Sequence, residues 1–140
     1  MDEPYRRRLL WHGFLYLLLA LLLGFPTALA PRGRIWMAVH VTALIGSLLV
    51  LAVASAWEDL VLTPVQRRRA FVALLVGIYT NLILNVLGAL VDFPGPATQP
   101  GVKAPLWQYA VFGVFGVVLV PSLLFSVGMV LHGLRRQPPA

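Results

Sequence analysis

Four runs of about 20 or more mostly apolar residues dominate this sequence, and no Asp, Glu, Lys or Arg interrupts any of them. At a rise of about 1.5 Å per residue, each run is long enough to cross the roughly 30 Å of hydrocarbon in a bilayer. Because lipid offers the backbone no hydrogen-bond partners, such runs are expected to be helical. The predicted spans cover residues 9–30, 35–57, 70–91 and 106–133.

The composition favours a membrane protein over a soluble domain. Charged residues make up 11% of the 140 residues, and the mean hydropathy is +0.84, whereas soluble domains carry about 25% charged residues. A soluble domain of 15.4 kDa could not bury this much apolar surface. We therefore predict an all-α fold, an integral membrane four-helix bundle that forms one domain over residues 1–140.

The basic residues predict how the bundle lies in the membrane. The formal net charge is +6, and eight of the eleven basic residues form three clusters beside the apolar runs, at 6–8, 67–69 and 135–136. By the positive-inside rule, this distribution places both termini in the cytoplasm and the spans in the inner membrane of the cell. No aromatic or Gly-rich RNA-binding pattern accompanies the charge, so we predict the lipid bilayer, and not nucleic acid, as the partner.

Shorter signals refine this topology. The segment Thr63-Pro64-Val65-Gln66 has the pattern of a capping box with proline at the first helical position, which predicts a helix start ahead of the third span. Residues 92–105 are rich in Pro and Gly and are expected to form a loop that covers the helix ends. Pro121 is expected to kink the fourth span. Aromatic residues typical of membrane interfaces lie near the span ends: Trp11, Trp36, Trp57, Trp107 and Tyr109.

Polar side chains inside a span are costly, so their positions suggest functional sites. His40 lies about five residues, or roughly 7 Å, into the second span. Asn81 and Asn85 are one turn apart on the third span and share a face. Because that span runs in the opposite direction, Asn85 is expected near the depth of His40. With Tyr79 close by, these residues predict a polar pocket beneath the loop at 92–105.

Each of these residues has a functional and a structural interpretation. His40 could ligate a metal or a heme iron, which neutral imidazole suits, or it could hydrogen-bond between helices. The two asparagines could likewise bridge helices, and Tyr79 could be a packing residue whose hydroxyl finds a partner. His12 and His132 both lie near the predicted cytoplasmic ends of their spans, either as interfacial residues or as a bis-histidine site.

The common catalytic patterns are missing from the sequence. It has no carboxylate pair inside a span for general acid–base catalysis, and no G-x-S-x-G, P-loop or H-E-x-x-H pattern. It has no cysteine, which excludes thiolate catalysis and Cys-ligated metal. An enzyme built from this chain would therefore depend on a bound cofactor or a Lewis acid.

Short motifs along nearly the whole chain resemble the small membrane isomerases that include hydroxylaminobenzene mutase and styrene oxide isomerase. The motif that opens the fourth span looks closer to the mutase branch. In chain order the motifs are Leu10-Trp11-His12-Gly13, Pro31-Arg32, Ala38-Val39-His40 with Gly46, Gly77-Ile78-Tyr79-Thr80-Asn81 and Ala104-Pro105-Leu106-Trp107-Gln108.

This resemblance implies a heme-dependent isomerase. In the epoxide-converting members, heme b lies near the subunit interfaces of a homotrimer, and the histidine that His40 matches ligates an iron that acts as a Lewis acid. For this chain the resemblance implies that a small lipophilic hydroxylaminoarene becomes an aminophenol, with His40 as the heme and metal ligand. Asn81, Asn85 and Tyr79 are then the predicted catalytic residues. An epoxide that rearranges to an aldehyde is the alternative substrate.

Two departures separate the chain from the epoxide isomerase. Gly46 stands where that enzyme has a substrate-positioning asparagine, and Asn85 where it has a tyrosine with the same task, whereas Asn81 matches. Asn85 or Tyr79 is therefore expected to supply the missing hydrogen bond. The two departures also leave open a non-catalytic heme-binding membrane subunit. A small transporter is a further alternative, against which the lack of charge inside the spans argues.

Overall fold

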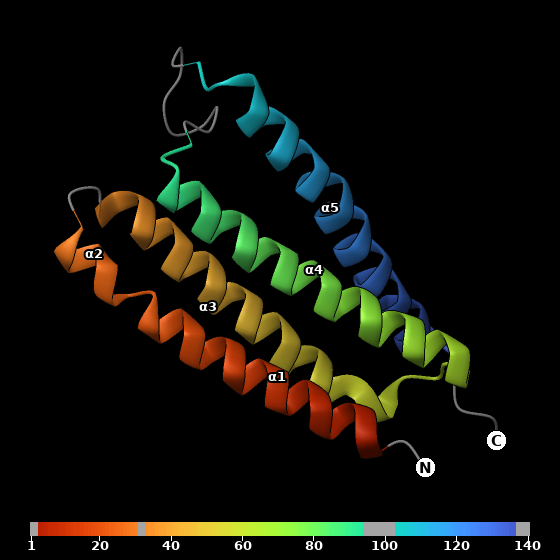
Figure 1. The fold of residues 1–140 in the computed structure, drawn as a ribbon. Helices are drawn as coiled ribbons and strands as arrows, with labels where there is room; N and C mark the ends of the chain where they lie inside the picture. The colour runs from red at the N-terminus through yellow and green to blue at the C-terminus, as the bar shows by residue number, and fades with distance from the viewer. Residues whose placement is uncertain (1–2, 31–32, 94–102, 137–140) are drawn as a thin grey trace.

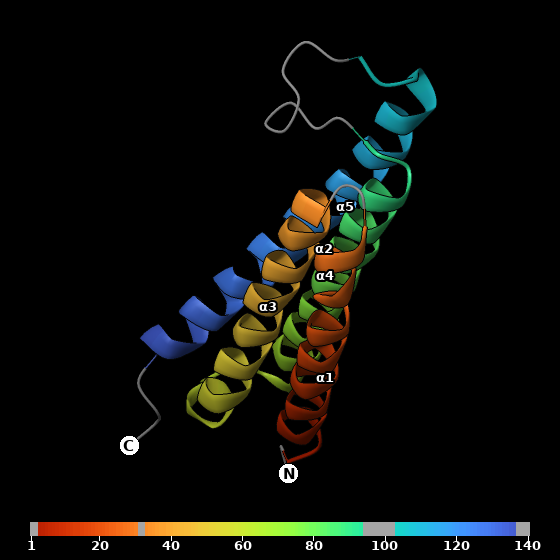
Figure 2. The same cartoon turned by 90° about the vertical axis from the view of Figure 1, so that its left-hand side faces the viewer.

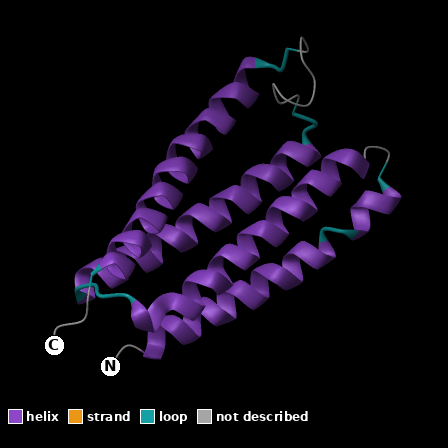
Figure 3. Cartoon of the chain, turned by 180° about the vertical axis from the view of Figure 1, so that it is seen from behind, coloured by secondary structure: helices purple, strands orange, loops and turns teal. Residues whose placement is uncertain are grey.

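The structure is a computed structural model that describes residues 3–30, 33–93 and 103–136, with side chains from Tyr5 onward. No strand occurs among these residues (Figure 3), which confirms the predicted all-α fold. A 3-10 turn, η1 (Trp57–Asp59), follows the third helix. The helices are α1 (Glu3–Leu22), α2 (Phe25–Leu29), α3 (Gly33–Ala56), α4 (Pro64–Leu90) and α5 (Leu106–Arg135).

Four helical segments of the described chain are long and apolar enough to cross a membrane, which confirms the predicted number of spans. The helices also continue beyond the apolar runs, because polar residues can prolong a helix outside the hydrocarbon. Helix α1 begins at Glu3 rather than at residue 9, and α5 continues on both sides of Pro121. The segments are Tyr5–Leu29, Gly33–Asp59, Pro64–Leu90 and Leu106–Arg135.

The first span is interrupted between α1 and α2, which the sequence analysis did not predict. The Gly24 amide donates to the Leu21 carbonyl at 3.0 Å, and not to the Ala20 carbonyl four residues back. Pro26, in the first turn of α2, has no amide hydrogen with which to continue the helical ladder. The break therefore releases the Ala20 carbonyl from its usual helical partner.

Helix α4 begins with the predicted capping box. The Thr63 hydroxyl accepts a hydrogen bond from the Gln66 amide at 3.3 Å, and the Gln66 side-chain carbonyl accepts one from the Thr63 amide at 2.9 Å. Pro64 occupies the first turn, where an amide hydrogen would have no helical acceptor. These residues provide hydrogen-bond partners for the start of a helix that continues into the third span.

The helices form two antiparallel pairs. Helix α1 packs against α3, α4 packs against α5, and α3 contacts α4 to join the pairs, while α2 folds back onto α3 (Figures 1 and 2). The start of α1, the α3–α4 connection and the end of α5 lie at one end of the bundle (Figure 1). The three basic clusters therefore gather at this end, as predicted from the alternation of the spans.

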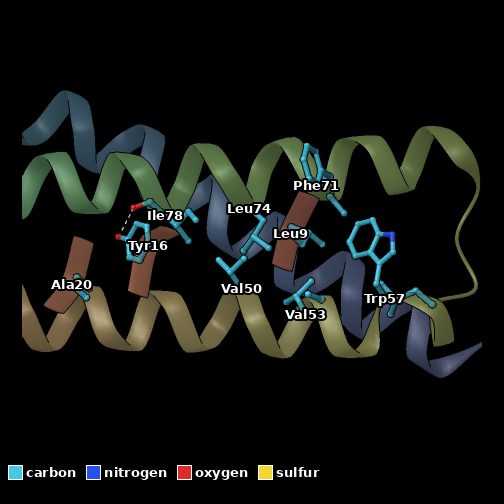
Figure 4. Packing of buried hydrophobic residues seen from close by; sticks show 13 residues of the cluster. Leu9, Tyr16, Ala20, Val50, Val53, Trp57, Phe71, Leu74 and Ile78 are labelled. Carbon is cyan, nitrogen blue, oxygen red and sulfur yellow. Dashed lines mark hydrogen bonds between the residues drawn. The ribbon is translucent and has the colours of Figure 1, made fainter. Parts of the chain in front are cut away.

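Buried apolar side chains concentrate toward that end, which we call the closed end: residues 5–20, 47–78 and 126–136. Figure 4 shows its core, to which α1, α3 and α4 all contribute. Trp57 is fully buried in this core and packs against Tyr5, rather than lying exposed at a membrane interface as its position suggested. The Arg67 guanidinium donates to the Leu60 carbonyl at 2.6 Å, and the Val61 amide donates to the Gly133 carbonyl at 3.1 Å.

The opposite part of the molecule, residues 21–46, 79–93 and 103–125, is the open end. Among its described residues only Val39, Ala43, Gly46 and Gln108 are buried. Most of α5 at this end is exposed, including the large apolar side chains of Leu106, Val114, Val117 and Leu124. The predicted loop over the helix ends includes residues 94–102, which lie outside the described residues, so its position stays a prediction.

Candidate functional site

His40 lies two turns into α3, and its half-buried ring contacts the break between α1 and α2. The Nδ1 atom lies 2.7 Å from the Ala20 carbonyl oxygen. Because a carbonyl only accepts, Nδ1 carries the proton, and in the neutral ring Nε2 keeps its lone pair. The acceptor is the same carbonyl that the break releases, so the local path of the chain determines the tautomer of His40.

Gly24 allows the ring to come this close. A Cβ atom at Gly24 would lie 3.2 Å from both Cε1 and Nδ1 of His40, closer than nine in ten real contacts of this kind. Gly24 also borders an open apolar hollow of about 370 Å³, whose other lining residues are Leu21, Phe25, Ala28 and Leu29. His40 therefore stands beside an apolar surface that the α1–α2 break creates.

Asn81 and Asn85 share a face of α4, as their spacing predicted, and they hydrogen-bond to each other within that helix. The Asn85 Nδ2 group donates to the backbone carbonyl of Asn81 at 2.8 Å and to its side-chain Oδ1 at 2.9 Å. These two bonds use both side-chain N–H groups of Asn85. Within the described chain, the Asn85 side-chain carbonyl has no hydrogen-bond donor and remains available as an acceptor.

Tyr16 connects α1 to this part of α4. Its side chain is fully buried, and its hydroxyl donates to the Ile78 carbonyl at 2.7 Å (Figure 4). The Tyr16 ring passes over Gly46, where a Cβ atom would come within 2.8 Å of Cε1. The ring also meets Tyr79 edge-on, with centroids 5.8 Å apart.

Tyr79 pairs with His12 rather than with His40. The Tyr79 hydroxyl and the His12 Nδ1 atom are 2.8 Å apart, and their rings meet edge-on. His12 therefore has a partner deeper in the bundle than an interfacial position would give. His132 is exposed on α5, and no hydrogen bond joins it to His12 in the described structure.

The structure thus divides the predicted pocket into separate contacts. In the described part of the chain, His40 makes no hydrogen bond to Asn81, Asn85 or Tyr79. Asn85 nevertheless lies seven residues, about 10 Å, beyond Ile78, where Tyr16 meets α4. His40 lies six residues, about 9 Å, beyond Gly46, where Tyr16 meets α3. The predicted common depth of His40 and Asn85 agrees with this arrangement.

Sequence reasoning missed two contributors to this region. Ala20 acts through its main-chain carbonyl, so its side chain carries no signal. Tyr16 lies in a leucine-rich run and looks like a packing residue; only the hydrogen bond from its hydroxyl to the Ile78 carbonyl distinguishes it. The described residues contain no group of three or more His, Cys, Asp or Glu side chains able to hold a metal ion. A lone histidine instead suits a cofactor that brings most of its own ligands, as heme does.

Comparison with protein families matches residues 5–135 to a family described as styrene oxide isomerase. The chain belongs to the styrene oxide isomerase family. It is also 28% identical, over 140 residues, to hydroxylaminobenzene mutase HabB of Ectopseudomonas oleovorans, an alignment that covers 98% of this chain and 85% of that protein. No solved structure gives a significant match.

Membership of the styrene oxide isomerase family confirms the resemblance that the short motifs indicated. Together with the mutase to which the chain is similar, it identifies the protein as an isomerase. The non-catalytic subunit and the transporter are therefore set aside. The four membrane-compatible helices make this member of the family a multi-pass membrane protein.

Proposed function

We propose that the protein rearranges hydroxylaminoarenes to aminophenols within the membrane, with heme b bound through His40. The observation that carries this proposal is the hydrogen bond from His40 Nδ1 to the Ala20 carbonyl, which leaves Nε2 ready to ligate. Ligand histidines commonly donate their other ring N–H in this way, because the bond fixes the ring and raises the basicity of the ligating nitrogen. The name of the similar mutase supports the choice of substrate.

The surroundings of His40 suit a flat and mostly apolar cofactor. The apolar hollow beside Gly24 offers a wall for a macrocycle, and no charged side chain lines it. When bound, the heme iron would act as a Lewis acid and draw electrons from the substrate oxygen. The charge-free interior of the bundle supplies no such group of its own. His40 would hold that group at a fixed angle, because its ring is tied to the main chain of α1.

The Asn81–Asn85 pair favours a substrate that brings its own hydrogen-bond donor. Both side-chain N–H groups of Asn85 are used within the pair, so only its side-chain carbonyl oxygen remains for the substrate. That oxygen needs a hydrogen-bond donor as its partner. A hydroxylaminoarene carries N–H and O–H donors, whereas an epoxide carries only an acceptor oxygen. We assign the Asn85 carbonyl to the substrate N–H, Asn81 to the support of Asn85, and Tyr79 to the aromatic wall near the substrate ring.

The reaction needs no external oxidant or reductant. The N–O bond breaks, a C–O bond forms on the ring, and the proton displaced from the ring balances the one gained at nitrogen. Substrate and product therefore have the same atoms, as an isomerase requires. A hydrogen bond from the substrate N–H to Asn85 would hold the nitrogen while the oxygen changes its position.

An epoxide isomerase is the second candidate, because the matching family carries the description styrene oxide isomerase. It predicts an aldehyde as the product. The Asn85 carbonyl would then have no donor to accept from, which is why we place this candidate second.

The proposal also covers the membrane in which the enzyme lies and the number of copies that assemble. The basic clusters at the closed end support a cytoplasmic location for both termini in the inner membrane. The resemblance to the epoxide-converting members supports a homotrimer, in which a second copy would cover part of the exposed surface of the open end.

The visible absorption spectrum of detergent-purified protein, expressed with ample heme, tests the cofactor. We expect a Soret band that His40→Ala removes and that His132→Ala, at an exposed position of α5, retains. Colourless wild-type protein would overturn the heme assignment.

Incubation with phenylhydroxylamine or with styrene oxide tests the substrate. We expect aminophenol from the first, formed faster than phenylacetaldehyde from the second, and neither product from His40→Ala. A faster conversion of styrene oxide would reverse the order of the two candidates.

A further inference from the structure

We infer that the closed end binds the headgroup of an anionic phospholipid through two pairs of arginines on neighbouring helices. The pairs are Arg7 with Arg8 on α1, and Arg68 with Arg69 on α4. This surface takes no part in the proposed reaction, so the inference holds or fails independently of that reaction. It also goes beyond the topology, which depends only on how many basic residues each side of the membrane carries.

The bundle uses two arginines of its closed end for its own contacts. Arg6 forms an ion pair with Glu58, with 3.4 Å between Nε and Oε1. The Arg67 guanidinium donates to the Leu60 carbonyl at 2.6 Å and to the Trp57 carbonyl at 3.5 Å. The other arginines of the three basic clusters are exposed, and none of them has a hydrogen bond or an ion pair within the described chain. They are Arg7, Arg8, Arg68, Arg69, Arg135 and Arg136.

The arginines at the end of α5 have an explanation that the other four lack. Arg135 lies in the last turn of α5, where the partial negative charge of the helix end favours a cation. Arg7 and Arg8 lie near the beginning of α1, and Arg68 and Arg69 near the beginning of α4, where no acidic residue stands in the first turn. These two pairs gain no such benefit from their helix ends, and their charge remains uncompensated within the described chain.

The two pairs also lie close to a direct contact between their helices. Tyr5 lies two residues before Arg7, and Phe71 lies two residues after Arg69. The rings of Tyr5 and Phe71 contact each other with centroids 5.1 Å apart. Like charges gathered in this way repel each other unless an anion lies between them. Among the side chains described at this end, Asp59 is the one carboxylate without an ion-pair partner, a single negative charge against four positive ones.

An exposed apolar stripe continues from the arginines along α1. Trp11, Phe14 and Leu18 follow Arg7 by four, seven and eleven residues. This spacing places them on one face of the helix, and all three side chains are exposed. A group bound at Arg7 would therefore have apolar surface directly beside it, in the direction of the membrane interior.

Helix α4 repeats this arrangement. Val72 and Val76 follow Arg69 by three and seven residues, and both are exposed. Guanidinium groups bind phosphate oxygens through paired N–H groups, and acyl chains match the apolar stripes. A phospholipid joins these two chemistries in one molecule. A headgroup with net negative charge is the form that compensates the unpaired arginines.

Lipid titration tests the headgroup site. Native mass spectrometry of the full chain in a neutral detergent measures the apparent affinity for phosphatidylglycerol and for zwitterionic phosphatidylcholine. We expect phosphatidylglycerol to bind more tightly. Arg68→Gln/Arg69→Gln should weaken its binding by about 25-fold, or about 5-fold for each arginine. Equal affinity of the wild-type protein for the two lipids would overturn the inference.

The pair at the end of α5 supplies the matched control. Arg135→Gln/Arg136→Gln removes the same charge from the same end of the bundle and should weaken the binding of phosphatidylglycerol far less. Equal losses in the two double variants would overturn the site, because the general field of the basic end would then explain both.

Thermal unfolding in detergent tests the source of the phosphate. Phosphatidylglycerol should raise the unfolding temperature, because a ligand that binds the folded state stabilises it. This effect should disappear in about 1 M salt. Inorganic phosphate, glycerol phosphate and a short RNA, each at the same concentration of charge, should raise the temperature less. Equal protection by any one of them would overturn the assignment to a lipid.

A tryptophan variant tests the apolar part of the site. Trp11→Ser should weaken the binding of phosphatidylglycerol, because it removes a large apolar side chain from the stripe beside Arg7. Trp107→Ser, at an exposed position of the open end, is the control and should not. Unchanged binding in Trp11→Ser would contradict the seating of an acyl chain along α1.

Discussion

The closed end of the bundle buries its apolar side chains far more completely than the open end does. At the closed end, Trp57, Leu60 and Leu74 are almost completely buried, and Arg67 and Gly133 tie the α3–α4 connection to its neighbours. At the open end, α4 has no buried residue from Tyr79 to Leu90, and α5 has one, Gln108, before Ser126.

The polar side chains proposed for the site are distributed in the opposite way. His40, Asn81 and Asn85 lie in the open end, where each remains partly exposed to an environment of lipid. Polar groups in that environment are costly and tend to serve a function. The closed end therefore forms its own core. The open end keeps an exposed apolar surface and polar groups that are available to a ligand. The comparison predicts that substitutions at the open end change chemistry, whereas those at the closed end change stability.

The largest effect is expected at His40. Without the imidazole the proposed cofactor has no ligand from this chain, so His40→Ala should lower turnover by at least about 1,000-fold, toward the uncatalysed rate. The thermal unfolding temperature in detergent, measured without heme, should stay close to that of wild type. A large loss of stability in heme-free His40→Ala would break the proposed division between the two ends.

Trp57 should give the reverse pattern. Trp57→Ala removes a fully buried indole from the closed end, and large aromatic-to-alanine changes in cores cost about 3–5 kcal/mol. Thermal or denaturant unfolding in detergent measures this loss, with activity normalised to the folded fraction expected to remain. Trp107→Ala, whose side chain is 53% exposed at the open end, is the matched control and should cost far less.

Asn85 should affect the choice of substrate more than the fold. Asn85→Leu keeps an apolar side chain of similar size and removes the acceptor, so kcat/KM for phenylhydroxylamine should fall by about 10- to 100-fold. Conversion of styrene oxide, which offers no donor to that acceptor, should fall less. Equal losses for both substrates would show that Asn85 contributes to structure alone.

The smallest effect is expected at Thr63, which belongs to the closed end. Thr63→Ala removes the hydroxyl of the capping box and should lower the free energy of unfolding by about 1 kcal/mol. Thr63→Ser retains the hydroxyl and should recover most of that stability. Any change in kcat/KM for the folded protein would contradict the separation of the two ends.

Much of the fold could be predicted because its signals are local. Apolar length alone identified the four spans, and Thr63 with Gln66 predicted the start of α4 through a motif complete within four residues. That Asn81 and Asn85 share a face followed from one turn of helix in the same way.

The remaining features depend on contacts between helices, which hydropathy does not encode. Tyr79 turns toward His12 because aromatic side chains bridge α1 and α4 at that level. The break between α1 and α2 lies inside an apolar run, where Gly24 and Pro26 read as features of a continuous span. Trp57 looked interfacial because it lies at the end of a predicted span. Its position in the sequence does not show which side chains cover it.

The break in the first span also affects how this site can change through mutation. The atom that orients His40 belongs to the main chain at Ala20, so every residue that keeps the local backbone path supplies it equally well. The sequence of this chain therefore contains no polar side chain that marks the partner of His40. Loss of the orientation instead requires a substitution that restores a continuous helix, and Gly24 is the position where that change would also press on the imidazole.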